Sequence, residues 1–159
     1  AVHANNKKRV VRALETYYLT GMTKSEWDRQ SRTHEMPFDA LVIGLYFEDR
    51  QRLYERINER VDRMFLLGLE DEVRRLDGTL GTTARAAIGY KEMTAYLRGE
   101  CSLDEAREAI KTASRRYAKR QMTWFRSKPY VHPVSADGGE ESIKSRVFEM
   151  IEGFLGGDK

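Results

Sequence analysis

The chain has 159 residues, of which 40% are hydrophobic and 33% are charged, and its net charge is +3. This composition supports one domain with a modest core, and no apolar run approaches the roughly twenty residues that a membrane-spanning helix needs. The mild positive charge permits nucleic acid as a partner without requiring it. A single cysteine, Cys101, excludes an internal disulfide and a cysteine zinc site, and the three histidines lack metal-ligand spacing. No signal peptide opens the sequence, which favours the cytoplasm.

The first predicted element is a helix over residues 7–20, with Asn5 and Asn6 as candidate N-caps and Gly21 at its end. Cations crowd its first turns, from Lys8 to Arg12, where the helix dipole disfavours positive charge. A bound phosphate would offset that cost. A short polar helix is expected next, over residues 24–32.

Two segments have the character of β-strands. Residues 39–47 are a near-continuous apolar run, as in a strand of a parallel sheet that is buried on both faces, and residues 130–135 are the second candidate. Because about eighty residues of mostly helical pattern separate them, we expect two strands of a larger α/β sheet. The predicted class is therefore mainly α with two short strands, and the parallel sheet is incomplete in this sequence.

Helical patterns fill the space between the two strands. We predict helices over residues 49–67 and 70–76, a loop over 78–83, and a helix over 84–98 that Gly89 interrupts unfavourably. Gly89 either lets a backbone approach a ligand closely or serves a tight helix contact.

The helix over residues 49–67 carries a ridge of arginines at i,i+4 spacing: Arg52, Arg56 and Arg60. Carboxylates lie between them, so periodicity alone favours a salt-bridged face in solvent.

A long basic helix over residues 102–126 is the most informative segment. Ser102 and Glu105 form a capping box at its start. A second ridge of cations follows at i,i+4 spacing, which is either a solvated face or a surface for a polyanion: Arg107, Lys111, Arg115 and Lys119. Residues 114–126 hold five cations and three aromatic side chains without an acidic residue, a mixture typical of nucleic-acid binding. The last predicted helix, over residues 141–155, is amphipathic and structural.

Four segments, residues 5–15, 54–62, 87–92 and 116–126, together resemble the tRNA dimethylallyltransferase (tRNA isopentenyltransferase) family in order and spacing. The resemblance implies part of a P-loop-NTPase-like α/β enzyme, which moves a dimethylallyl group from its diphosphate to N6 of an adenosine beside the anticodon. It also implies nucleotide binding and Mg²⁺. The phosphate-loop motif G-x-x-x-x-G-K-[ST] does not occur in this sequence, so we expect a C-terminal portion that lacks the phosphate-loop half. We expect this portion to be inactive by itself.

The resemblance further implies an arrangement and a set of partners. Residues 1–135 would be the C-terminal portion of the core with its RNA-binding helices, and residues 136–159 a terminal amphipathic helix and tail. The partners would be a tRNA anticodon stem-loop and dimethylallyl diphosphate, with no membrane, and an exposed sheet edge would allow a homodimer.

Site residues follow from the same resemblance. Arg60, and secondarily Arg56, would bind the diphosphate, whereas no catalytic residue or metal ligand is assigned. Tyr90 and Trp124 would stack on bases or line the pocket, although Trp124 suits core packing equally. The positions implied to contact tRNA are Lys8, Arg9, Val10, Val11, Arg12, Ala86, Ala87, Ile88, Gly89, Tyr90, Lys91, Lys119, Arg120, Gln121, Met122, Thr123, Trp124, Phe125 and Arg126.

Two alternative functions remain open. A non-catalytic RNA-binding module would need only the basic helix over residues 114–126. A helix-turn-helix DNA binder built on residues 23–32 is disfavoured, because that segment lacks the apolar spacing of a recognition helix.

Overall fold

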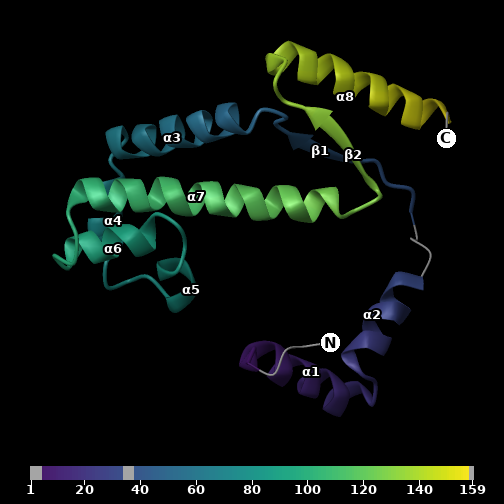
Figure 1. Ribbon diagram of the computed structural model, residues 1–159, viewed down its shortest axis with the longest axis horizontal. Helices are drawn as coiled ribbons and strands as arrows, with labels where there is room; N and C mark the ends of the chain where they lie inside the picture. The colour runs from purple at the N-terminus through teal and green to yellow at the C-terminus, as the bar shows by residue number, and fades with distance from the viewer. Residues whose placement is uncertain (1–4, 34–37, 158–159) are drawn as a thin grey trace. The chain divides into compact units, whose positions relative to one another are not determined.

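The computed structural model describes residues 5–33 and 38–157, and the chain divides into two compact units before and after residue 40. The first unit contains α1 (Lys7–Thr20) and α2 (Lys24–Thr33) (Figure 1). The predicted caps of α1 are confirmed, since Asn6 Oδ1 accepts a hydrogen bond from Arg9 N at 3.3 Å and Gly21 takes a φ of 71°.

The second unit is built on a sheet that has two strands within the described residues. β1 (Val42–Tyr46) and β2 (Val131–Ser135) pair in parallel, with Val42 opposite Val131 and Tyr46 opposite Ser135. Both predicted strands are therefore confirmed, although β1 is shorter than the predicted 39–47. The expected burial of β1 on both faces is wrong, since none of its five residues is buried and Leu45 is 58% exposed. Helix α8 (Gly139–Gly156) follows β2 and packs against it (Figure 1).

Asp137 joins the end of β2 to the segment that follows β1. Its Oδ2 accepts a hydrogen bond from Glu48 N at 2.7 Å, and its carbonyl oxygen accepts one from Arg52 Nη1 at 2.8 Å. The bond from Glu48 N is the main reason that the pKa of Asp137 lies below its ordinary value. Asp137 thus ties the strand ends to the start of α3 (Arg50–Leu66).

Helices make most of the core of the second unit. Helices α3 and α7 run side by side, and α4 and α6 pack near the start of α7 (Figure 1). Their bounds are α3 (Arg50–Leu66), α4 (Leu69–Leu76), α6 (Tyr90–Leu97) and α7 (Leu103–Arg126). The buried cluster between them consists of Val61, Leu69, Val73, Met93, Ala106 and Ile110. The capping box of α7 is confirmed, with Ser102 N donating to Glu105 Oε2 at 2.8 Å and Glu105 N donating to Ser102 Oγ at 3.3 Å.

The predicted continuous helix over residues 84–98 is wrong. A short helix, α5 (Thr82–Arg85), occupies part of the predicted loop, and α6 begins only at Tyr90. Gly89 separates them because its φ of 100° lies outside the helical region. Its backbone N–H donates to Glu92 Oε2 at 2.9 Å, which caps the new helix.

The terminal helix α8 confirms the predicted amphipathic helix, although its Phe148 is 61% exposed. Across the described segments, no helix combines the length and the apolar character that crossing a bilayer would require. The boundary that we predicted between residues 135 and 136 stays a prediction.

Candidate nucleic-acid interface

The ridge of cations on α7 faces α3 over most of its length. Lys111 Nζ lies 2.9 Å from Asp62 Oδ1 on α3 and 3.1 Å from Glu108 Oε1, and the Lys111 side chain is only 13% exposed. The hydrogen bond to Asp62 is the main reason that the pKa of Lys111 is raised. Lys111 is therefore an interhelical contact rather than a surface for a polyanion.

Two other members of this ridge also contact α3. Arg115 Nη1 donates to Asn58 Oδ1 at 2.7 Å, and the Arg107 guanidinium lies 4.7 Å from the centroid of the Phe65 ring. Of the four cations in this ridge, Lys119 alone is classed as exposed, and the other three are partly buried. Arg107, Lys111 and Arg115 each contact a side chain of α3 as well as one of α7, so these three cations join the two helices and do not form a free surface for a polyanion.

A pocket of about 800 Å³ lies between α3, α7 and the connection from α5 to α6, and we call it the interhelical pocket. It brings together residues from three separate parts of the predicted site, namely Arg60, Ala86, Ala87, Ile88, Arg120 and Gln121. The structure thus places Arg60, the residue predicted to bind the diphosphate, around one cavity with residues predicted to contact RNA.

Arg56, the secondary candidate for the diphosphate, has a different environment. Its guanidinium lies 5.4 Å from the centroid of the Phe47 ring. It therefore makes a cation–π contact after β1, whereas Arg60 lines the interhelical pocket.

Gly89 is buried and Tyr90 is partly buried. The Tyr90 ring packs against the buried cluster, and its hydroxyl donates a hydrogen bond to Glu72, which raises the pKa of Tyr90. A Cβ at Gly89 would meet its nearest atom, the Met64 methyl group, only at 4.0 Å, so the positive φ and not a close approach requires glycine. Lys91 next to them is exposed.

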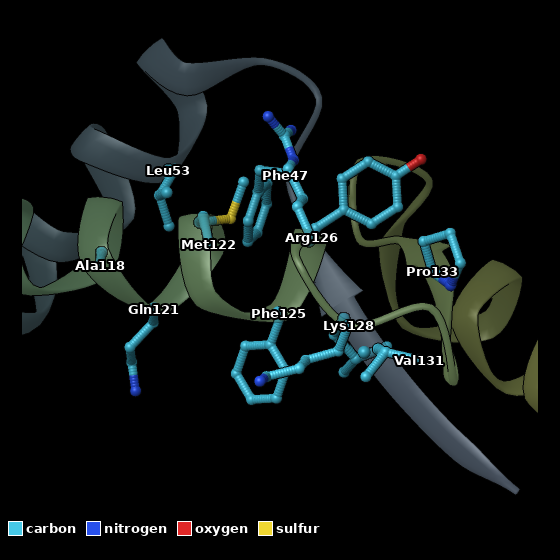
Figure 2. A pocket seen from close by; sticks show the side chains of 13 residues that line it. Phe47, Leu53, Ala118, Gln121, Met122, Phe125, Arg126, Lys128, Val131 and Pro133 are labelled. Carbon is cyan, nitrogen blue, oxygen red and sulfur yellow. The ribbon is translucent and has the colours of Figure 1, made fainter. Parts of the chain in front are cut away.

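A second pocket, of about 480 Å³, lies between β1 and the last turns of α7. Figure 2 shows Met122 pointing toward Phe47 on one side of α7, with Phe125 on the opposite side. Arg126 and Lys128 also line this pocket. The predicted contact segment 119–126 therefore contributes to both pockets.

Trp124 remains at the surface, with 52% of it exposed. Its ring packs edge-on against Phe125 at a centroid distance of 5.0 Å, and Lys128 Nζ lies 5.0 Å from its centroid. The exposure favours the interpretation of Trp124 as a contact residue over core packing. Thr123 is exposed beside it, and its hydroxyl donates to Lys119 O at 2.9 Å.

Helix α1 presents the predicted contacts of the first unit. Lys8, Arg9 and Arg12 are exposed, Val11 is 54% exposed, and Val10 is partly buried. The first turn holds no acidic residue, and Arg12 Nη1 pairs with Glu15 Oε2 at 2.9 Å. These cations are therefore accessible to an anion.

Sequence reasoning missed several residues that line the interhelical pocket. The sequence pattern assigns no individual site role to Ile57, Ser114 or Tyr117, yet all three line this cavity. The spacing of Tyr117 and Arg120 at i,i+3, with Ile57 and Arg60 at the same spacing on α3, was an available signal.

Comparisons with known proteins find relatives that match nearly the whole chain. A model of the IPP transferase family matches residues 1–128. A tRNA dimethylallyltransferase of Shouchella clausii is 48% identical, covering 99% of this chain and 49% of the relative. One of Geobacillus thermodenitrificans is 51% identical, covering 97% of this chain and 50% of the relative.

Solved structures agree with these matches. The crystal structure of a tRNA isopentenylpyrophosphate transferase from Bacillus halodurans matches with a TM-score of 0.69 and 40% identity, covering 98% of this chain and 46% of that one. A related structure from Staphylococcus epidermidis gives a TM-score of 0.68 at 38% identity, covering 95% of this chain and 50% of that one. The expected fold class is confirmed, and the chain spans about half the length of the curated relatives it matches.

Proposed function

The chain belongs to the IPP transferase family, and we propose that it supplies the RNA-binding and diphosphate-binding parts of a tRNA dimethylallyltransferase. The reaction would form a bond from the N6 nitrogen of an adenosine beside the anticodon to the allylic carbon, while the carbon–oxygen bond to diphosphate breaks. One observation carries this proposal: Arg60, the connection over residues 86–88, and Arg120 with Gln121 line a single pocket.

Arg60 has the chemistry that the leaving group needs. Negative charge grows on the diphosphate as the allylic carbon–oxygen bond breaks, and a guanidinium can donate two parallel hydrogen bonds to its oxygens. Arg56 would be the secondary ligand of the diphosphate, because its guanidinium already makes a cation–π contact with Phe47. No described residue is assigned here as the base that takes the N6 proton.

The exposed cations would hold the anticodon stem-loop of the tRNA. Lys8, Arg9 and Arg12 on α1 and Lys119 on α7 are accessible for phosphate contacts, which position an RNA without reading its sequence. The reacting adenosine must leave its stack, and exposed Trp124 is suited to stack in the space it vacates. This work would take place in the cytoplasm.

The described residues contain no cluster of potential metal ligands. Nowhere in residues 5–33 and 38–157 do three or more His, Cys, Asp or Glu residues gather closely enough to hold a metal ion. We therefore assign no step to Mg²⁺, and its ligands would lie elsewhere in a protein of the relatives' length.

The proposal is tested by Arg60→Ala in the full-length protein that carries this chain. We expect kcat/KM for prenyl transfer to fall by about 100-fold or more, while the Kd for the anticodon stem-loop changes less than about threefold. Arg63→Ala is the matched control, because Arg63 lies on the same helix, is exposed and does not line the interhelical pocket. Equal effects of Arg60→Ala on both quantities, or none, would favour a non-catalytic RNA-binding module.

Two further expectations concern the isolated chain. It should show no turnover with tRNA and dimethylallyl diphosphate. It should also self-associate through an open edge of its sheet, because the sheet of the described residues has only the two strands β1 and β2. Analytical ultracentrifugation would report a monomer at all concentrations if the edge were inert.

A further inference from the structure

We infer that Tyr117 is a stacking platform for an unpaired base of the RNA loop, braced by Arg120. The inference rests on the proposed function, because it assumes that an RNA loop enters the interhelical pocket.

The geometry of Tyr117 sets it apart from the other aromatic residues of the site. It lines the interhelical pocket together with Arg60 and Ile88, yet it is 49% exposed. The Arg120 guanidinium lies 5.5 Å from the centroid of its ring, one helical turn further along α7. Among the described residues, none forms a hydrogen bond with its hydroxyl group, so the ring is not held in the fold as the Tyr90 ring is.

This pairing suits a nucleobase. A flat base gains from stacking on an aromatic ring whatever its identity, and an adjacent guanidinium adds a cation–π contact and a donor for the neighbouring phosphate. The volume of about 800 Å³ falls within the roughly 300–1,000 Å³ of ligand pockets, so the pocket is large enough to admit a base. The open face of the Tyr117 ring therefore suits a base.

Tyr117 also lies close to the predicted diphosphate site, because it lines the same pocket as Arg60. Because Arg60 lines the same cavity, a base held on Tyr117 would anchor the RNA loop beside the predicted diphosphate site. Tyr117 would thus position the RNA, without itself taking part in bond making or breaking.

The test uses the full-length protein and anticodon stem-loops that each carry 2-aminopurine at one loop position. Fluorescence of 2-aminopurine falls when the base stacks on an aromatic ring. With wild-type protein we expect quenching at one loop position on binding. Tyr117→Leu, which keeps an apolar helix-forming side chain, should abolish that quenching and weaken binding by roughly 5- to 150-fold.

Rescue by aromatic variants separates stacking from packing. Tyr117→Phe and Tyr117→Trp should retain both the quenching and the affinity, since each preserves a ring face. Tyr130→Leu is the matched control, because Tyr130 is 54% exposed and lies outside the residues that line the interhelical pocket. It should bind as wild type.

The outcomes are distinguishable. If Tyr117→Leu keeps the quenching and the affinity while Arg60→Ala still impairs transfer, the platform is refuted and the proposed function stands. Should Tyr117→Leu misfold, loss of quenching in Tyr117→Phe and Tyr117→Trp would equally refute it. If the wild-type protein does not bind the stem-loop, the proposed function fails, and the platform with it.

Discussion

Lys111 Nζ on α7 lies 2.9 Å from Asp62 Oδ1 on α3. The residues next to them in the sequence, Ile110 on α7 and Val61 on α3, both belong to the buried cluster. The neighbouring bond from Arg115 to Asn58 repeats the same connection about one turn further along. The basic ridge of α7 is thus largely a contact that holds α3 in place. Since α3 carries Arg60, these contacts also determine where that guanidinium stands in the interhelical pocket.

Removal of this ion pair should lower stability. In a double-mutant cycle with Lys111→Ala and Asp62→Ala, we expect a coupling energy of about 1 kcal/mol, because the lysine is mostly buried. The measurement is urea denaturation of the three variants and the wild type. The Lys144–Glu140 pair, whose side chains are 50% and 79% exposed, is the control and should couple by less than about 0.5 kcal/mol. Equal coupling in both pairs would contradict a special role for Lys111.

A methyl group at Gly89 should be costly, because an alanine is strained at its φ of 100°. We expect Gly89→Ala to lower the free energy of unfolding by about 1–3 kcal/mol. Gly153→Ala is the opposite case, since Gly153 lies within α8 and an added Cβ meets no atom within 4 Å. That change should stabilise by about 0.5–1 kcal/mol. Thermal denaturation compares the two, and a tolerated Gly89→Ala would show that the backbone there relaxes.

RNA affinity should depend on the exposed cations of α7 and not on those of the interhelical contact. Lys119→Gln should reduce the slope of log affinity against log salt concentration by about 0.7–0.9, the value for one phosphate contact. Lys111→Gln should leave that slope unchanged, because its ammonium group is paired with Asp62. Fluorescence anisotropy with an anticodon stem-loop at several salt concentrations gives both slopes. A reduced slope for Lys111→Gln alone would reverse the assignment.

Acid should loosen the connection that Asp137 makes. Its pKa is depressed in the folded protein, chiefly by the hydrogen bond from Glu48 N. The stabilisation is therefore fully present above the pKa of an unfolded aspartate, roughly 4, and is lost as the pH falls through the lower folded value. Melting temperatures measured between pH 7 and pH 2 should fall more steeply for the wild type than for Asp137→Asn. Parallel curves would show that Asp137 does not contribute.

Short-range features of this protein could be predicted well from its sequence. The bond between Asn6 and Arg9 and the capping box of Ser102 with Glu105 each join residues three positions apart, so the local order of side chains suffices to identify them. The strand β1 was likewise recognisable from the apolar run over residues 39–47. The family was recognisable because its motifs recur in order along the chain.

The role of each cation depended on contacts that no local pattern contains. Arg115 meets Asn58 across 57 residues of sequence, and the periodicity of α7 shows which cations share a face but not what that face meets. For the same reason the interhelical pocket, which joins Arg60 to Tyr117 and Arg120, emerges only when α3 packs against α7. Helix ends and strand patterns follow from neighbouring residues, whereas a cavity and the partner of a charge follow from how distant segments pack together.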